Sequence, residues 1–355
     1  MRTLVIAAFC CLTLIHSLAS TARACTSFCF DTPDGPVFGA NLDLFIPADG
    51  LVFVNLRRVE KEGHQSSTTG ETAKWVSRYR SVTFSLAGRE FAWSGMNEAG
   101  LVLSSMELLA SEHPEPDERP PLYIGTWAQY VLDTCGSVGE VIQVDSLVRI
   151  EDEAPPSHYL VADADGNCAA IEFLDGRFVY YTGENLPVKA MSNMRYERAL
   201  AAYERGGPRW WWSNPGQSAE RFAAAHARSE SYDASRDTGA VSYAFGTLLH
   251  VVAAPHTKWN VVYDIAKREV WFRSVASPAI KRLSLNAFDL SCEAPLLMLD
   301  VNAALEGNVE QSFTPYDHDI NLAVFRTFCD RYGIEVSEEG AAGLMLFFES
   351  FDCAP

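Results

Sequence analysis

Short β-favouring runs separated by turn residues are the feature that most constrains the fold of this chain. Four such runs cover residues 26–30, 37–44, 50–57 and 101–107, with turn signals at Asp34-Gly35 and at 97–100. A meander over 158–181 has Asp165-Gly166 and Asp175-Gly176 as its hairpin turns. These runs are not interleaved with helices in a regular strand-helix-strand order. The sequence therefore predicts an α+β layered domain.

Helical spacing of apolar residues predicts the remaining elements. We expect helices over 124–135, 195–203, 219–229, 241–252 and 321–332, and a further hairpin over 258–274. Ser137 and Glu140 have the spacing of a capping box for one more short helix. The acidic, proline-rich segment 113–121 predicts an exposed loop. No repeat or linker divides the chain, so residues 25–355 are expected to form a single domain.

The first 24 residues have the pattern of a secretory signal peptide. A basic start at Arg2 precedes an apolar run over 4–14, and Ala22-Arg23-Ala24 forms a small-residue cleavage site. We expect export to a periplasm or to the medium, with Cys25 as the first mature residue. There is no second apolar run long enough to cross a bilayer, so no membrane partner is expected after cleavage.

Composition and charge limit the partners. The 355 residues are 48% hydrophobic and 12% aromatic, enough for a sizeable core. The formal charge is −18, and removing residues 1–24, which contain two arginines and no acid, makes it more negative still. This balance argues against nucleic acid or an anionic membrane as a partner.

The number of cysteines leaves at least one thiol without a disulfide partner in an oxidising compartment. Seven of the nine cysteines follow residue 24, and an odd number leaves at least one unpaired. Cys25 is our candidate for the unpaired thiol, and Cys292 could pair with Cys329 or with Cys353. The chain contains neither a C-x-x-C motif nor a histidine-rich cluster, so no metal site and no cofactor are expected.

An N-terminal Cys25 would carry a thiol and a free α-amine on one residue. The ordinary pKa of a thiol, about 8.5, and that of an α-amine, about 7.7 to 8.0, are nearly matched, so this residue could be both nucleophile and general base. A cysteine at this point is also where lipid is attached in lipoproteins, although Ala22 and Arg23 fit that pattern poorly. Residues 1–30 alone leave both interpretations open.

Several segments occur in an order that resembles the choloylglycine hydrolase family of N-terminal-nucleophile hydrolases, which includes bile-salt hydrolases and penicillin V acylases. The resemblance covers nearly the whole mature chain. The segments are Cys25-Thr26, Gly39-Ala40-Asn41-Leu42-Asp43, Gly95-Met96-Asn97-Glu98-Ala99-Gly100-Leu101, Met191-Ser192-Asn193, 215–222 and Trp259-Asn260-Val261-Val262-Tyr263-Asp264.

The resemblance implies a four-layer αββα fold and a thioester mechanism. Cys25 matches the nucleophile, and Asp43 the aspartate that bonds the α-amine. Asn193 matches the oxyanion donor to within about a residue, and Arg221 the arginine near the nucleophile. Without the resemblance, Asp43 would be a local turn residue, Asn193 a helix cap and Arg221 a surface charge.

Two positions depart from the family pattern. Ala40 stands where the family usually has an arginine that touches the nucleophile, and Glu107 stands where relatives have an Asn or Tyr at the oxyanion pocket. An ionised Glu107 would repel an oxyanion, so it must be turned away, be protonated or make another contact. Trp210 and Trp211 could form an apolar rim for an acyl group or pack a loop onto the body.

The leading hypothesis is an exported cysteine amidase that hydrolyses a linear, non-peptide C–N amide bond of a small N-acyl compound. Conjugated bile acids, penicillin V-like amides, N-acyl homoserine lactones and fatty N-acyl amides all stay open as substrates. Two alternatives are an acyltransferase that uses the same thioester and an inactive binding protein or lipoprotein anchored at Cys25. The sequence leaves a homo-oligomer open.

Overall fold

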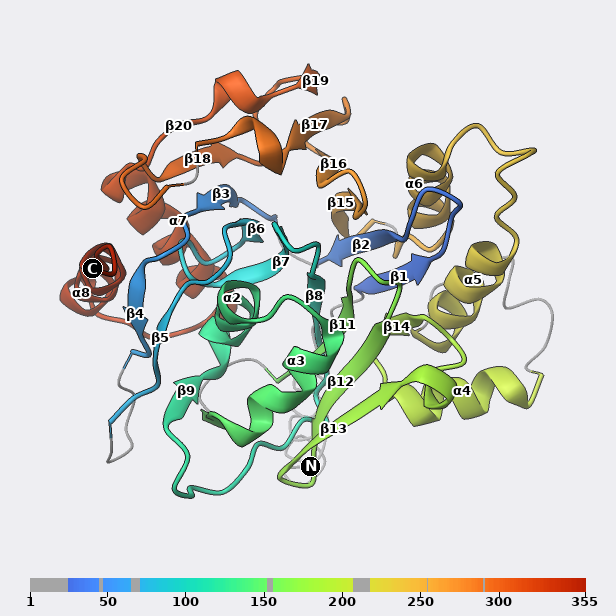
Figure 1. Ribbon diagram of the computed structural model, residues 1–355, viewed down its shortest axis with the longest axis horizontal. Coiled ribbons are helices and arrows are strands. Elements are labelled where there is room, and N and C mark those ends of the chain that lie inside the picture. The colour runs from blue at the N-terminus through green and yellow to red at the C-terminus, as the bar shows by residue number, and fades with distance from the viewer. Residues whose placement is uncertain are drawn as a thin grey trace, which may run out of the picture.

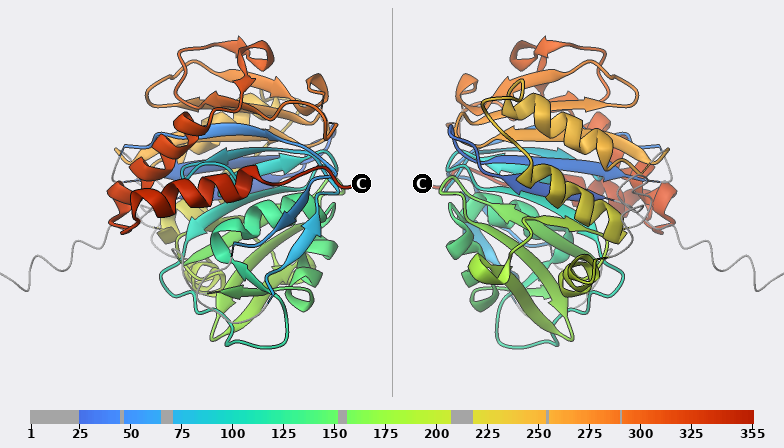
Figure 2. Two further views of the ribbon diagram at one scale, coloured as in Figure 1. Left: turned by 90° about the vertical axis from the view of Figure 1, so that its left-hand side faces the viewer. Right: turned by 90° about the vertical axis from the view of Figure 1, so that its right-hand side faces the viewer.

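The computed structural model describes residues 25–44, 47–64, 71–151, 156–206, 218–253, 255–289 and 291–355. Two large sheets lie face to face, with helices on both outer sides (Figure 1 and Figure 2). This is the predicted α+β, four-layer αββα arrangement. Trp210 and Trp211 fall outside the described residues.

The seven-stranded sheet has the order β14-β1-β2-β15-β16-β17-β19. Its neighbours pair antiparallel except β17 and β19, which pair parallel. Its strands are β1 (Thr26–Phe30), β2 (Val37–Asp43), β14 (Ala190–Ser192), β15 (Thr257–Asp264), β16 (Glu269–Ser274), β17 (Lys281–Ser284) and β19 (Gly307–Asn308).

The nine-stranded sheet has the order β13-β12-β11-β8-β7-β6-β3-β18-β20. Its strands are β3 (Leu51–Asn55), β6 (Ser81–Ser85), β7 (Ala92–Asn97), β8 (Val102–Glu107), β11 (Ser157–Ala162), β12 (Cys168–Leu174), β13 (Arg177–Thr182), β18 (Leu297–Asp300) and β20 (Thr314–Pro315). There are also two small sheets. In one, β4 (Glu60–Glu62) pairs with β5 (Lys74–Val76), and in the other, β9 (Pro121–Tyr123) pairs with β10 (Arg149–Glu151).

Helices cover the outer faces of both sheets. They are α2 (Ile124–Thr134), α3 (Val138–Gln143), α4 (Tyr196–Glu204), α5 (Ser218–Glu230), α6 (Ala240–His250), α7 (His318–Tyr332) and α8 (Glu338–Glu349). Helices α5 and α6 pack on β1, β2, β14 and β15, whereas α2 packs on β7 and β8. The N-cap half of the expected capping box is confirmed, because Ser137 Oγ accepts a hydrogen bond from the Glu140 backbone N–H at 3.2 Å, whereas the Glu140 carboxylate accepts from the Gly136 N–H.

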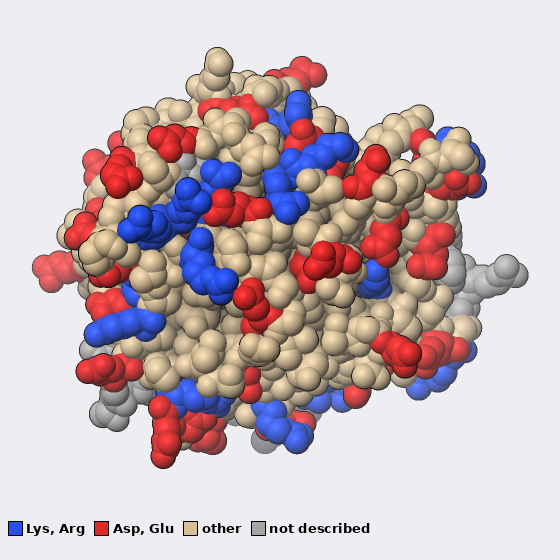
Figure 3. Space-filling view, viewed as in Figure 1, with Lys and Arg blue, Asp and Glu red and all other residues tan. Residues whose placement is uncertain are grey.

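The main core lies between the two sheets. The Tyr263 ring from one sheet meets the Phe84 ring from the other at 6.5 Å, and the Tyr263 hydroxyl lies 2.8 Å from Ser94 Oγ. A second core fills the space between the nine-stranded sheet and α2 and α3. No helix among the described residues is long and apolar enough to cross a bilayer. On the face in Figure 3, acidic and basic side chains are interspersed.

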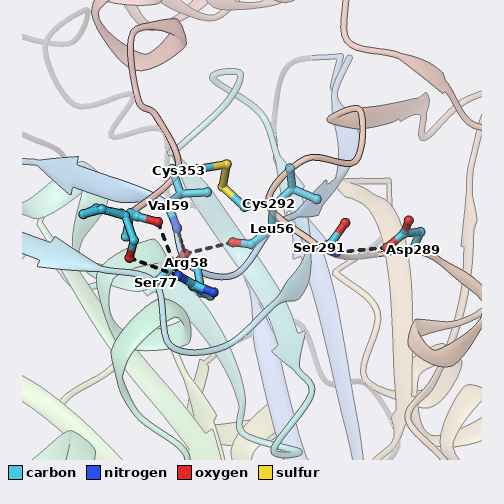
Figure 4. Close-up of a disulfide and its surroundings, with 10 residues drawn as sticks. Leu56, Arg58, Val59, Ser77, Asp289, Ser291, Cys292 and Cys353 are labelled. Carbon is cyan, nitrogen blue, oxygen red and sulfur yellow. Dashed lines mark hydrogen bonds between the residues drawn. A yellow bond between two sulfur atoms is a disulfide. The ribbon is translucent and has the colours of Figure 1, made fainter.

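A disulfide holds the C-terminus to the body. Of the two pairings that the sequence left open for Cys292, the structure has Cys292–Cys353. Cys353 also forms an isolated β-bridge with Val59, whose N–H donates to Ser77 Oγ at 2.9 Å (Figure 4). Cys25 takes part in no disulfide among the described residues, as the sequence predicts.

Candidate active site

Cys25, Asp43, Asn193 and Arg221 gather at one end of the two sheets. Thr26 at the start of β1 pairs with Asn41 near the end of β2 and with Ser192 at the end of β14. This antiparallel register brings Cys25, which precedes β1, beside Asp43 and the segment that begins at Asn193. The backbone pairing of the seven-stranded sheet therefore assembles the site.

Cys25 lies almost completely inside the protein, with 3% of its surface exposed. Its Sγ is 3.9 Å from the backbone oxygen of Asp43, the weak type of contact that a thiol donor makes. In the full-length chain the nitrogen of Cys25 belongs to the peptide bond with residue 24. Only cleavage of that bond would convert it into an amine.

Asp43 is a fully buried carboxyl group with an unusual environment. Burial raises its pKa from the ordinary 3.8 to about 7, although the Thr257 hydroxyl and the charges of Arg221 and Lys258 lower it. Within the described chain, neither carboxyl oxygen has a hydrogen-bond partner, since the Thr257 hydroxyl does not reach hydrogen-bond geometry. A buried carboxylate without a partner is costly, so this site favours a cationic neighbour.

Arg221 reaches the site from α5 and is 2% exposed. Its Nε donates to Thr26 Oγ1 at 3.0 Å, and one terminal nitrogen donates to Asn193 Oδ1 at 3.3 Å and Ser218 Oγ at 3.2 Å. Burial lowers the pKa of this guanidinium, and the negative charges of Asp43 and Cys25 raise it. The cation is thus placed to favour both a thiolate and a carboxylate.

Asn193 connects the two sheets at this end. Its Oδ1 accepts the hydrogen bond from Arg221, and its Nδ2 donates to the backbone oxygen of Glu107 at 2.9 Å. The first bond fixes which end of the amide faces the guanidinium. An amide N–H held in this way could donate to an oxyanion near Cys25.

Glu107 contributes its backbone to this contact. It is the last residue of β8, where Met106 belongs to the core between the sheets. Because neighbouring side chains on a strand point to opposite faces, the Glu107 side chain lies on the face away from that core. This geometry corresponds to the first of the three alternatives for Glu107, a carboxylate turned away from the nucleophile.

Ala40 occupies a wholly apolar position. It is completely buried on β2, pairs with Ser27 and Val261, and belongs to the core between the sheets. No cation stands at this point of the strand, so Arg221 is the arginine whose charge acts on Cys25 and Asp43.

An apolar cavity of about 540 Å³ lies at the same end of the nine-stranded sheet. Ser105, two residues before Glu107, and Ser157, which pairs with Glu107, line it from the strand face that carries the Glu107 side chain, and none of Cys25, Asp43, Asn193 and Arg221 is among its lining residues. Most of its lining is apolar or aromatic, including Trp93, Phe325 and Phe328. Its size is within the range of small-molecule pockets.

Sequence reasoning missed several residues that complete this arrangement. Thr26 and Ser218 both accept hydrogen bonds from Arg221. The hydroxyl groups carry no motif of their own, because their role depends on contacts between elements distant in the sequence.

Comparisons with known proteins agree with this architecture. Residues 25–205 match the family of linear amide C–N hydrolases, choloylglycine hydrolase family. A penicillin V acylase from Pectobacterium atrosepticum is 24% identical over 319 residues, which cover 76% of this chain and 84% of that protein.

Two solved structures are similar to most of this chain. Penicillin V acylase from Agrobacterium tumefaciens has a TM-score of 0.70 and 25% identity, covering 82% of this chain and 98% of its own. A variant of conjugated bile acid hydrolase from Clostridium perfringens has a TM-score of 0.64 at 14% identity, covering 78% and 96%. The second likeness concerns the fold alone.

The two packed sheets with helices on both outer sides are the fold of the N-terminal-nucleophile hydrolases. Within that class, the chain belongs to the choloylglycine hydrolase family of linear amide C–N hydrolases. It is accordingly a hydrolase that acts on linear amide C–N bonds.

Proposed function

We propose that this protein is exported, loses residues 1–24 and hydrolyses an N-acyl amide with Cys25 as an N-terminal nucleophile. The observation that carries the proposal is the Asp43 carboxyl group, buried without a hydrogen-bond partner among the described residues beside Cys25. Cleavage after Ala24 would place an α-amine on Cys25, and a cationic ammonium there would pair with Asp43. The same cleavage would create both the general base and the partner that Asp43 lacks.

The reaction would have two steps. The α-amine takes the thiol proton, and the Cys25 sulfur attacks the amide carbon to form a tetrahedral intermediate. Asn193 Nδ2 donates to the oxyanion, a type of contact that contributes about 3 to 4 kcal/mol. The C–N bond then breaks, the amine leaves with the proton from the ammonium, and the acyl group remains on sulfur as a thioester. Water cleaves the thioester, which releases a carboxylic acid and restores the thiol.

Arg221 supplies the charge that the nucleophile requires. The guanidinium favours the thiolate, a role that it takes without a second arginine at position 40. The relatives' names, penicillin V acylase and conjugated bile acid hydrolase, supply the first amides to assay.

The test is release of free amine from penicillin V, a conjugated bile acid and a fatty N-acyl amide by protein produced with its own first 24 residues. We expect turnover of at least one amide and its loss in Cys25→Ala. Cys135→Ala is the matched control, because burial raises the pKa of that thiol to about 12 and makes it a poor nucleophile. Full activity of Cys25→Ala would overturn the proposal.

A further inference from the structure

Two ionisable side chains, His158 and Glu172, lie buried beside the candidate site and take no part in the reaction described above. His158 is on β11, Glu172 is on the neighbouring β12, and both are 0% exposed. His158 Nδ1 lies 3.2 Å from Glu172 Oε1. Burying two such groups is costly, so their position in the core calls for a physical explanation.

Strand register places this pair near Asn193. Ser157, which precedes His158, pairs with Glu107, and the Glu107 backbone oxygen accepts the hydrogen bond from Asn193 Nδ2. His158 itself pairs with Met106 in the core between the sheets. The imidazole therefore lies one residue along the strand from the contact that holds Asn193.

Glu172 is attached directly to the segment that carries Asn193. Its Oε1 accepts a hydrogen bond of 2.9 Å from the backbone N–H of Tyr196, the first residue of α4. The residue before it, Arg195, offers no side-chain cap to this helix, so a carboxylate from another strand satisfies a first-turn N–H. The Tyr196 hydroxyl is also fixed, since it donates to the Val188 backbone oxygen at 3.1 Å.

Residues 193–196 are consequently held at both ends. The Asn193 side chain is bonded to β8, and the Tyr196 N–H is bonded to β12 through Glu172. Among the described residues, Glu172 Oε2 and His158 Nε2 have no partner, so Oε1 makes both observed contacts of the carboxylate. A rotation of the Glu172 carboxylate would release the start of α4, three residues after Asn193.

We infer that Glu172, oriented by His158, is a positioning residue that holds Asn193 where it can donate to the oxyanion. This inference rests on the function proposed above for Asn193. The buried pair then affects the rate of the chemical step rather than substrate binding. A displaced oxyanion donor reduces the stabilisation of the transition state more than that of the bound substrate.

The test is a double-mutant cycle between this pair and Asn193. His158→Leu/Glu172→Leu replaces both buried polar groups together, so neither member of the pair is left without the other, and the only bond within the described chain that it removes from α4 is the one to the Tyr196 N–H. We expect kcat to fall by about 10-fold or more, with KM changed less than about threefold. In an Asn193→Ala background, the same double substitution should lower kcat by less than about twofold.

Two further variants distinguish loss of Asn193 positioning from a non-specific disturbance of the core. Glu172→Gln keeps an oxygen that can accept from the Tyr196 N–H, so it should retain most of the wild-type kcat. Tyr263→Phe removes a different buried hydroxyl between the same sheets, the partner of Ser94, and should leave kcat unchanged. If the double-leucine variant does not fold, the cycle is run with Glu172→Ala.

The outcomes distinguish the inference from the proposed function. An equal loss of kcat in the wild-type and Asn193→Ala backgrounds would overturn the positioning role while leaving Asn193 as oxyanion donor. An Asn193→Ala variant with full kcat would overturn the oxyanion assignment and the positioning role with it. Coupling between the two sites, with rescue by Glu172→Gln, supports the inference.

Discussion

Replacing Asp43 by Asn should change the pH dependence of stability in a way that reveals the α-amine of Cys25. Burial raises the Asp43 pKa from 3.8 to about 7 in a chain where Cys25 has no free amine. Between these values the unfolded chain loses a proton that the folded chain keeps, so folding stability falls as the pH rises. A shift of about 3 units corresponds to about 4 kcal/mol, lost progressively between about pH 4 and pH 7.

The two forms of the chain should therefore respond differently. In a chain that keeps one residue before Cys25, we compare the free energy of unfolding of Asp43→Asn with that of the parent. The difference in favour of Asp43→Asn should be up to about 4 kcal/mol larger at pH 8 than at pH 4. In the mature chain an ammonium would pair with the carboxylate, lower its pKa and make this relative gain much smaller.

The assay is urea unfolding, monitored by circular dichroism at several pH values. It compares the parent and Asp43→Asn, each as the mature chain and as the chain with one extra residue. Asp34→Asn, at an exposed turn after β1, is the matched control for removal of one negative charge. Identical pH profiles for the mature and extended chains would refute the reasoning, because they would mean that the amine of Cys25 does not interact with Asp43.

Three other substitutions test separate parts of the structure. In Arg221→Lys, the ammonium cannot make the three hydrogen bonds that the guanidinium donates to Thr26, Asn193 and Ser218. We expect kcat to fall by about 100-fold in steady-state assays, whereas Arg228→Lys on the same helix should retain activity. Lys61→Met removes an ammonium that lies 2.9 Å from both Glu90 and Asp133, which leaves Asp133 buried without this cation and Glu90 with Arg89 alone. The free energy of unfolding should fall by about 3 to 5 kcal/mol. The exposed Lys74→Met should change it by less than about 1 kcal/mol, and equal losses would contradict this account. Cys292→Ser/Cys353→Ser opens a link across 61 residues, for which chain entropy predicts a loss of about 4 kcal/mol in urea unfolding, and an unchanged midpoint would contradict it.

Much of the fold follows from local sequence patterns. The runs at 26–30 and 37–44 correspond to β1 and β2, and the helix expected over 124–135 is α2. Strand β6 and helix α8 were not predicted. All five residues of β6 are buried and include three serine or threonine residues, and Gly340 and Gly343 interrupt the helical pattern of α8.

The site was only partly predictable for a different reason. Cys25, Asp43, Asn193 and Arg221 came from the resemblance to a family, and the structure brings all four together. Glu172 carried no signal, because one carboxylate in a strand pattern is indistinguishable from a surface charge until the neighbouring strands are placed. Such contacts depend on register between distant segments, which local periodicity does not encode.

The most direct test of the central claim is the intact mass of exported protein that is quenched with acid during turnover of an amide. The account predicts a chain that begins at Cys25 and carries one acyl group, released by hydroxylamine as expected of a thioester and absent in Cys25→Ala. Active protein that retains residues 1–24, or an acyl group attached to another residue, would contradict it.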